Sequence, residues 1–146
     1  AQLSGIALDL APGSFTTILA VGSGDSLQSM VIEENYGRIR GGNARVTAVN
    51  ALEGTGAPVN FTVGGGSISY VAFPGTIASR DGFDTAEVAP GTGVRVTGFN
   101  TGTVYAEDAN RAITAGHNYL VVVSGSADNA RLIVVDTDQD PGFQRG

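Results

Sequence analysis

The chain of 146 residues contains no cysteine, no tryptophan and no lysine, and its only histidine is His117. The absence of cysteine excludes disulfides, thiolate catalysis and cysteine-based zinc or iron–sulfur sites. With eight arginines against 14 acidic residues, the net charge of −6 argues against binding nucleic acid or anionic lipid through bulk electrostatics. No apolar run approaches the roughly 18–20 residues of a membrane-spanning helix. The sequence therefore predicts no nucleic-acid partner and no membrane span.

The composition is rich in glycine, threonine, serine and valine, and the sequence begins Ala1-Gln2-Leu3, without methionine. We expect from these features a processed protein that is secreted, at the cell surface or in the periplasm. A halophilic source is an alternative explanation, because acidic surfaces whose cations are all arginine also occur there.

Short runs of β-branched and aromatic residues alternate with glycine, proline, asparagine and aspartate along the chain. We expect strands at residues 6–10, 15–21, 28–33, 44–50, 59–63, 67–73, 83–88, 93–99, 103–106, 118–124 and 131–136. The denser apolar runs at 18–21, 120–123 and 132–135 are typical of central strands covered on both faces. No window shows a sustained helical period, so the sequence predicts an all-β sandwich.

An internal repeat relates the two ends of the chain at an offset of 103 residues. Residues 10–33 lie over residues 113–136 without a gap, with turn glycines at the same places. We therefore predict that residues 1–37 form the closing half of a β-sandwich repeat, and that residues 38–146 form a complete module with a short polar tail. The first part is then an extra partial-repeat meander, which packs on its own chain or completes a neighbouring subunit. One irregular sandwich with coincidental internal similarity is the alternative.

A meander of this kind exposes an apolar face and unpaired strand edges. The predicted function is a non-enzymatic extracellular structural subunit that self-assembles with copies of itself through β-strand addition, into filaments or surface arrays. The residues expected at the assembly interface are Ile6, Leu8, Leu10, Ile18, Val31 and Phe143.

A family resemblance is carried by two segments, ARVTAVNA at residues 44–51 and ITAGHNYLVVVSG at residues 113–125. They resemble a family of secreted prokaryotic tandem β-sandwich repeat domains of unknown function, whose modules open with an RVVNA strand and close with an AGxxYxVVVxG strand pair. The resemblance covers residues 38–136 as one module and residues 6–35 as the tail of another. It implies an immunoglobulin-like or transthyretin-like antiparallel β-sandwich at the cell surface, without an established enzymatic activity.

A second resemblance is to the periplasmic adaptor of bacterial alginate O-acetylation, and it rests on GTIASR at residues 75–80 and VAP at residues 88–90. It implies an alternative function as a polysaccharide-binding module, adaptor or adhesin. The acidity of this chain departs from what a polyuronate requires, so such a partner needs a local basic patch. The residues expected to form that patch and contact the glycan are Arg38, Arg40 and Arg45.

His117 is the sole imidazole, so a Ser-His-Asp triad or a histidine-based zinc site would depend on it alone. Nothing near it resembles a nucleophile elbow, and residues 64–66 lack the lysine of a phosphate loop. We therefore expect neither an enzyme nor an organic cofactor. Calcium is the one metal expected, because Asp136, Asp138 and Asp140 place carboxylates at alternate positions. A solvated acidic strand end is the alternative.

Aromatic side chains bind sugars where several of them share one exposed face. More often such residues lie in the core or on a sheet face, which is what we expect here. The residues concerned are Tyr36, Tyr70, Phe73, Phe83, Phe99, Tyr105, Tyr119 and Phe143. Phe143 is the exception, because it lies in the polar tail, where it would dock into a neighbouring subunit.

Overall fold

The computed structural model describes residues 15–21, 28–34, 38–55, 57–74 and 82–137. All of the regular elements in these residues are strands, and none of the residues forms a helix long and apolar enough to cross a membrane. The strands are β1 (Phe15–Val21), β2 (Gln28–Glu34), β3 (Ala44–Glu53), β4 (Val59–Val63), β5 (Gly66–Val71), β6 (Phe83–Val88), β7 (Gly91–Gly98), β8 (Val104–Ile113), β9 (Asn118–Ser126) and β10 (Asn129–Asp136). The predicted all-β class is confirmed.

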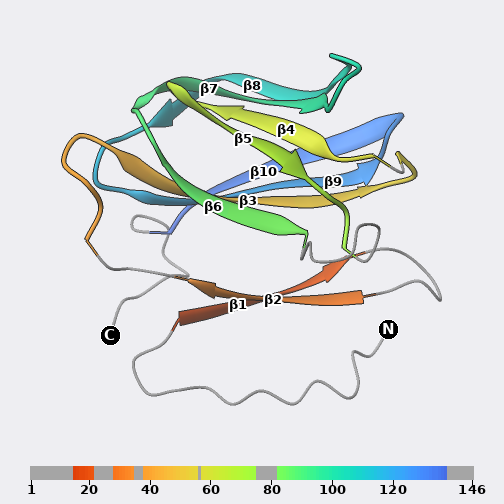
Figure 1. The fold of residues 1–146 in the computed structure, drawn as a ribbon, viewed down its shortest axis with the longest axis horizontal. Helices are drawn as coiled ribbons and strands as arrows, with labels where there is room; N and C mark the ends of the chain where they lie inside the picture. The colour runs from red at the N-terminus through yellow and green to blue at the C-terminus, as the bar shows by residue number, and fades with distance from the viewer. Residues whose placement is uncertain (1–14, 22–27, 35–37, 56, 75–81, 138–146) are drawn as a thin grey trace.

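The strands form two four-stranded sheets, packed face to face, and a separate two-stranded hairpin (Figure 1). The first sheet has the strand order β10-β9-β3-β6, and the second has the order β5-β4-β7-β8. The hairpin β1–β2 lies against the outer face of the first sheet. The predicted β-sandwich is therefore confirmed, and the hairpin adds a third layer to it.

One strand pair departs from the antiparallel arrangement expected for the sandwich. β3 and β9 run parallel, from the pair Arg45–Asn118 to the pair Glu53–Ser126. Parallel neighbours require a long crossover connection, and here the chain passes through β4 to β8 between the two strands. This pairing joins residues that are far apart in sequence, so local alternation of apolar and polar residues does not predict it.

Both β3 and β9 are buried on their two faces. On the inner face, Val46 and Val121 join the sandwich core, in which Phe61 of β4 is fully buried. On the outer face, Val49 and Leu120 belong to a second apolar cluster, which is closed by a residue of β2. These two strands therefore form the central layer of the molecule.

The three dense apolar runs were predicted to be strands covered on both faces, and they differ in their burial. Residues 120–123 of β9 are buried, as expected. Residues 132–135 of β10 are not, because Ile133 is 49% exposed and its neighbours are half-buried. The prediction of a central strand is wrong there, since β10 is an edge strand of the first sheet. In the run 18–21, the one side chain that the structure describes is Ala20, which is exposed.

β8 extends well beyond the strand predicted at residues 103–106, because its second half is polar. Its side chains from Glu107 to Asn110 are exposed, although they continue the strand to Ile113. β8 is an edge strand whose neighbour in the sheet is β7. Backbone hydrogen bonds to one neighbouring strand hold such a strand in place. Its solvent-exposed side chains can therefore be polar throughout.

The two ends of the chain carry hairpins with the same register. Ile18 pairs with Val31 in β1–β2, and 103 residues further on Val121 pairs with Val134 in β9–β10. Six of the seven residue pairs in the first hairpin have such a counterpart in the second. The internal similarity of the sequence therefore extends to the pairing of the strands.

Asn50 is a fully buried polar residue of β3 that joins the two sheets. Its Nδ2 donates a hydrogen bond to the carbonyl oxygen of Val71 in β5, at 2.9 Å. Its Oδ1 accepts a hydrogen bond from the backbone N–H of Leu52, at 3.0 Å. Because both partners are buried, neither has water to replace the amide.

We predict that Asn50→Ala lowers the free energy of unfolding by about 2 kcal/mol, because it leaves a buried carbonyl and a buried N–H without partners. Urea denaturation followed by circular dichroism measures the change. The control is Asn110→Ala, at an exposed position of β8, which should change the free energy by less than about 0.5 kcal/mol. Equal effects of the two substitutions would contradict the bridging role of Asn50.

Candidate functional site

The hairpin β1–β2 is attached to the sandwich through Ile32 of β2. Ile32 is 1% exposed and packs against Val49 and Ala51 of β3 and against Leu120 and Val122 of β9. Within the described part of the chain, β1 and β2 pair only with each other. The hairpin thus contacts the first sheet through side chains, while its outer strand edges belong to neither four-stranded sheet.

Two of the residues predicted for the assembly interface lie in this hairpin. Ile18 of β1 and Val31 of β2 are register partners near the middle of the ladder. The other members of the predicted set lie outside the described residues, namely Ile6, Leu8, Leu10 and Phe143. The backbone thus brings one pair of the set together.

The three arginines predicted to contact a glycan differ in their surroundings. Arg45 is 8% exposed, and its guanidinium donates hydrogen bonds to the carbonyl oxygen of Arg38 at 3.1 Å and to Oδ1 of Asn118 at 3.4 Å. Arg40 is exposed, and its Nε lies 3.0 Å from Oε2 of Glu87. The side chain of Arg38 is exposed. Arg45 therefore links β3 to β9. Of the three arginines, Arg38 and Arg40 have exposed side chains.

Arg40 also stabilises the ionised form of Glu87 in β6. The backbone N–H of Arg40 donates a hydrogen bond to Oε1 of Glu87 at 2.5 Å, and its guanidinium binds the other carboxylate oxygen. Hydrogen bonds to a carboxylate favour its charged form, so the pKa of Glu87 lies below its ordinary value of 4.5. The pair fixes the segment before β3 to the edge strand β6.

Asp136, the first of the three predicted calcium ligands, is hydrogen-bonded to the histidine. Its Oδ2 lies 2.8 Å from Nδ1 of His117, where β10 ends beside the start of β9. Asp138 and Asp140 lie outside the described residues. The described ranges hold no group of three or more acidic, histidine or cysteine side chains arranged for a metal. Calcium binding therefore stays a prediction.

His117 also makes contacts that fix the beginning of β9. Its ring stacks on Tyr119, with ring centroids 6.2 Å apart and planes 20° apart. Its carbonyl oxygen accepts a hydrogen bond from the backbone N–H of Arg45, at 3.0 Å. Over the residues that the structure describes, no hydrogen bond joins His117 to a serine, so no catalytic triad is assembled there.

Three aromatic residues, two from strands and one from the turn after β7, meet at one end of the second sheet. Tyr70 of β5 and Phe99, which follows β7, are in edge-to-face contact, with centroids 4.8 Å apart and planes at 86°. Together with Tyr105 of β8 they line a pocket of about 230 Å³. The remaining lining residues are Ala57, Pro58, Gly98, Asn100 and Thr101. All three aromatic residues are candidates from the sequence, but their spacing does not predict that they meet.

Two of the pocket residues have left-handed backbone conformations, with φ of 62° at Tyr70 and 78° at Asn100. The backbone N–H of Tyr70 donates to Oδ1 of Asn60 at 3.0 Å, at an irregularity in the pairing of β4 with β5. A bulky residue with positive φ is uncommon and costs about 1–3 kcal/mol. Observed strain of this kind clusters at functional sites, where it directs a side chain.

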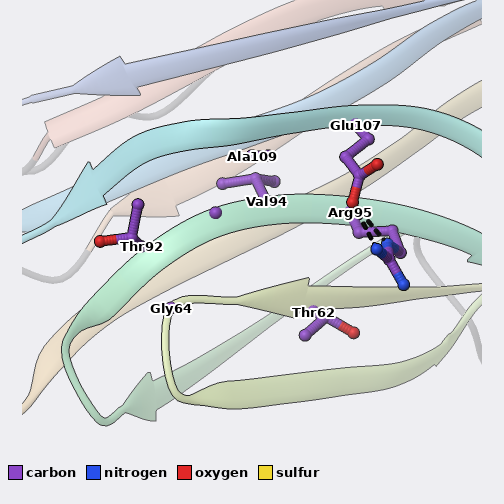
Figure 2. A pocket seen from close by; sticks show the side chains of 8 residues that line it. Thr62, Gly64, Thr92, Val94, Arg95, Glu107 and Ala109 are labelled. Atoms are coloured by element: carbon purple, nitrogen blue, oxygen red, sulfur yellow. Dashed lines mark hydrogen bonds and ion pairs between the residues drawn. The ribbon is translucent and has the colours of Figure 1, made fainter.

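A second cavity, of about 360 Å³, lies over β4, β7 and β8 (Figure 2). Arg95 and Glu107 lie at one end of it, with Nη2 and Oε2 2.6 Å apart, and Thr92 lies at the other end. Because Glu107 balances the charge of Arg95, the pair offers no net charge to an anion. The register of β7 with β8 shifts between Thr92 and Val94, and both residues line this cavity.

No protein-family model matches the chain, and no curated protein matches it. Among solved structures, the chain is similar to a putative cell adhesion protein from Bacteroides uniformis, at 13% sequence identity and a TM-score of 0.38. The similarity covers 88% of this chain and 68% of that one. A similarity this distant carries no conclusion about function. The resemblances to the tandem repeat family and to the alginate adaptor stay predictions.

We predict that Glu87→Gln removes part of the acid sensitivity of the fold. The pKa of Glu87 is lower in the folded than in the unfolded chain, so its contribution to stability is present above the unfolded-state pKa and is lost as the pH falls through the folded-state pKa. Wild type should therefore melt at a higher temperature than the variant at neutral pH, and the two should converge in acid.

Thermal melts from neutral to acidic pH test this, with Asn110→Ala, at an exposed position of β8 without a titratable group, as the control. Arg40→Gln should keep part of the effect, because the backbone N–H of Arg40 is the largest cause of the lowered pKa. A constant difference between wild type and Glu87→Gln at every pH would contradict the assignment.

Proposed function

We propose that this chain is a non-enzymatic β-sandwich module of an extracellular or cell-surface protein, and that it associates with copies of itself through the hairpin β1–β2. The observation that carries the proposal is the shared register of β1–β2 and β9–β10 at an offset of 103 residues. The hairpin repeats the design of one edge of the first sheet, yet it packs outside that sheet.

The equivalence supports the outer edge of β1 as the strand edge that would receive a partner. β9 has β10 on one side and the parallel strand β3 on the other. β1 corresponds to β9, and in the described residues it has β2 on one side only. An extended strand that pairs with the other edge of β1, parallel to it, would restore the arrangement of the first sheet. Unpaired N–H and C=O groups along a strand favour such addition.

The geometry of strand addition also favours a repeating assembly. A contact between the β1 edge of one copy and a different surface of the next is heterologous, and heterologous contacts continue into rings or filaments. Such an assembly needs no catalytic group. The sole histidine, His117, is hydrogen-bonded to Asp136 and stacked on Tyr119, which is consistent with a structural role. A structural or adhesive surface layer is the function that this arrangement serves.

Two of the three arginines predicted to contact an acidic polysaccharide have partners within the chain, which disfavours the alternative of an adaptor. Arg45 is enclosed by Arg38 and Asn118, and the guanidinium of Arg40 is paired with Glu87. A chain with a net charge of −6 repels a polyuronate unless such cations are available.

We predict that the protein self-associates with increasing concentration. Ile18→Asp and Val31→Asp should each weaken the association by at least about tenfold, because each places a charge in the β1–β2 hairpin, at whose β1 edge the partner would pair. Size-exclusion chromatography with light scattering measures the association, and electron microscopy shows whether filaments form. Val104→Asp makes the same charge change at a half-exposed residue of β8 and should leave the association unchanged. A wild-type protein that stays monomeric at every concentration would overturn the proposal.

A further inference from the structure

We infer that the pocket formed by Tyr70, Phe99 and Tyr105 is a carbohydrate-binding site that takes one neutral pyranose residue of an uncharged glycan. This site is independent of the hairpin and of the three arginines. The inference rests on the aromatic walls, the polar rim, the charge and the size of the pocket.

The aromatic walls suit the apolar faces of a sugar ring. The C–H groups of a pyranose carry small positive partial charges, and the face of an aromatic ring is negative. The edge-to-face contact of Tyr70 with Phe99, at 86°, presents ring surfaces in two directions. Tyr105 of β8 adds a third ring to the same pocket.

Glycine at position 98 keeps this space open. A Cβ atom at Gly98 would collide with Oγ1 of Thr101 and would lie 3.4 Å from the ring of Tyr105. Gly98 is buried and is the last residue of β7. Its missing side chain is what allows Thr101 and Tyr105 to approach β7 and line the pocket.

The rim supplies neutral hydrogen-bonding groups. Asn100 is exposed and lines the pocket, and within the described ranges no hydrogen bond is formed by its side chain. Oγ1 of Thr101 accepts the backbone N–H of Thr103 at 3.3 Å, which leaves its hydroxyl hydrogen to donate to a ligand. An amide and a hydroxyl beside aromatic rings match the alternating apolar and hydroxylated surfaces of a sugar.

Charge and size narrow the class of glycan. None of the described residues that line the pocket is charged, and the whole chain carries −6, so uronates and sulfated sugars are disfavoured. Among the lining residues that the structure describes, there is no carboxylate to bind an amine. A volume of about 230 Å³ is below the roughly 300–1,000 Å³ of sites for drug-sized ligands, and it suits a single ring with the rest of the glycan in solvent.

The test is calorimetric titration of the full chain with neutral gluco-, manno-, galacto- and xylo-oligosaccharides. An alginate oligosaccharide and tetramethylammonium are the acidic and cationic probes. We expect at least one neutral oligosaccharide to bind, and both charged probes to fail. Tight binding of alginate or of tetramethylammonium in place of the neutral sugars would overturn the inference, as would the absence of any binding at millimolar concentrations.

Asn100→Gly removes the rim amide and keeps the backbone, because glycine accepts the left-handed φ at this position. It should weaken binding by about threefold to tenfold. Phe99→Leu keeps an apolar side chain but removes the ring, and a loss of about tenfold is expected. The control is Val104→Ala, next to Tyr105 but outside the pocket, which should bind as wild type does. Equal affinities of wild type and both pocket variants would place the sugar elsewhere and overturn the site.

Discussion

The parallel pairing of β3 with β9 is the interaction on which the rest of the structure depends. These two strands are the centre of the first sheet, and their inner faces form the sandwich core with the second sheet. Their outer faces are also apolar, so they require a cover, which the hairpin provides through Ile32. The three layers are therefore consequences of two strands that have no solvent-exposed face.

The two proposed interaction surfaces lie on different layers of the molecule. The hairpin lies on the outer side of the first sheet (Figure 1), whereas the aromatic pocket is lined by residues of the second sheet and of its loops. None of the described lining residues belongs to β1 or β2, so a copy bound at β1 does not need to occupy the residues that line the pocket. An assembly built through the hairpin would then display one sugar-binding pocket per subunit, which is an arrangement suited to multivalent adhesion.

Much of the fold is predictable because strands have a local signature, whereas their neighbours do not. The alternation of Val59, Phe61 and Val63 places β4 correctly, and all three side chains are buried. The polar second half of β8 has no such signature. The parallel partner of β3 lies more than 60 residues away in sequence, and no local pattern encodes it.

The candidate sites were less accessible from sequence than the strands. Tyr70 lies in β5, Tyr105 lies in β8 and Phe99 lies in the turn after β7, and only the pairing of these strands brings the rings together. The three arginines lie close together in the sequence, but the fold separates their roles. A basic cluster in the sequence does not reveal that Arg45 is buried. The repeat at an offset of 103 residues was informative because it is a comparison within the chain, and the register of the two hairpins agrees with it.

The most direct test of the assembly account is the hydrogen exchange of the backbone amides of β1 (Phe15–Val21) as a function of protein concentration. If another copy pairs with the outer edge of β1, exchange there slows as the concentration rises, while exchange in the fully paired strand β9 stays the same. Exchange in β1 that is independent of concentration would contradict the account.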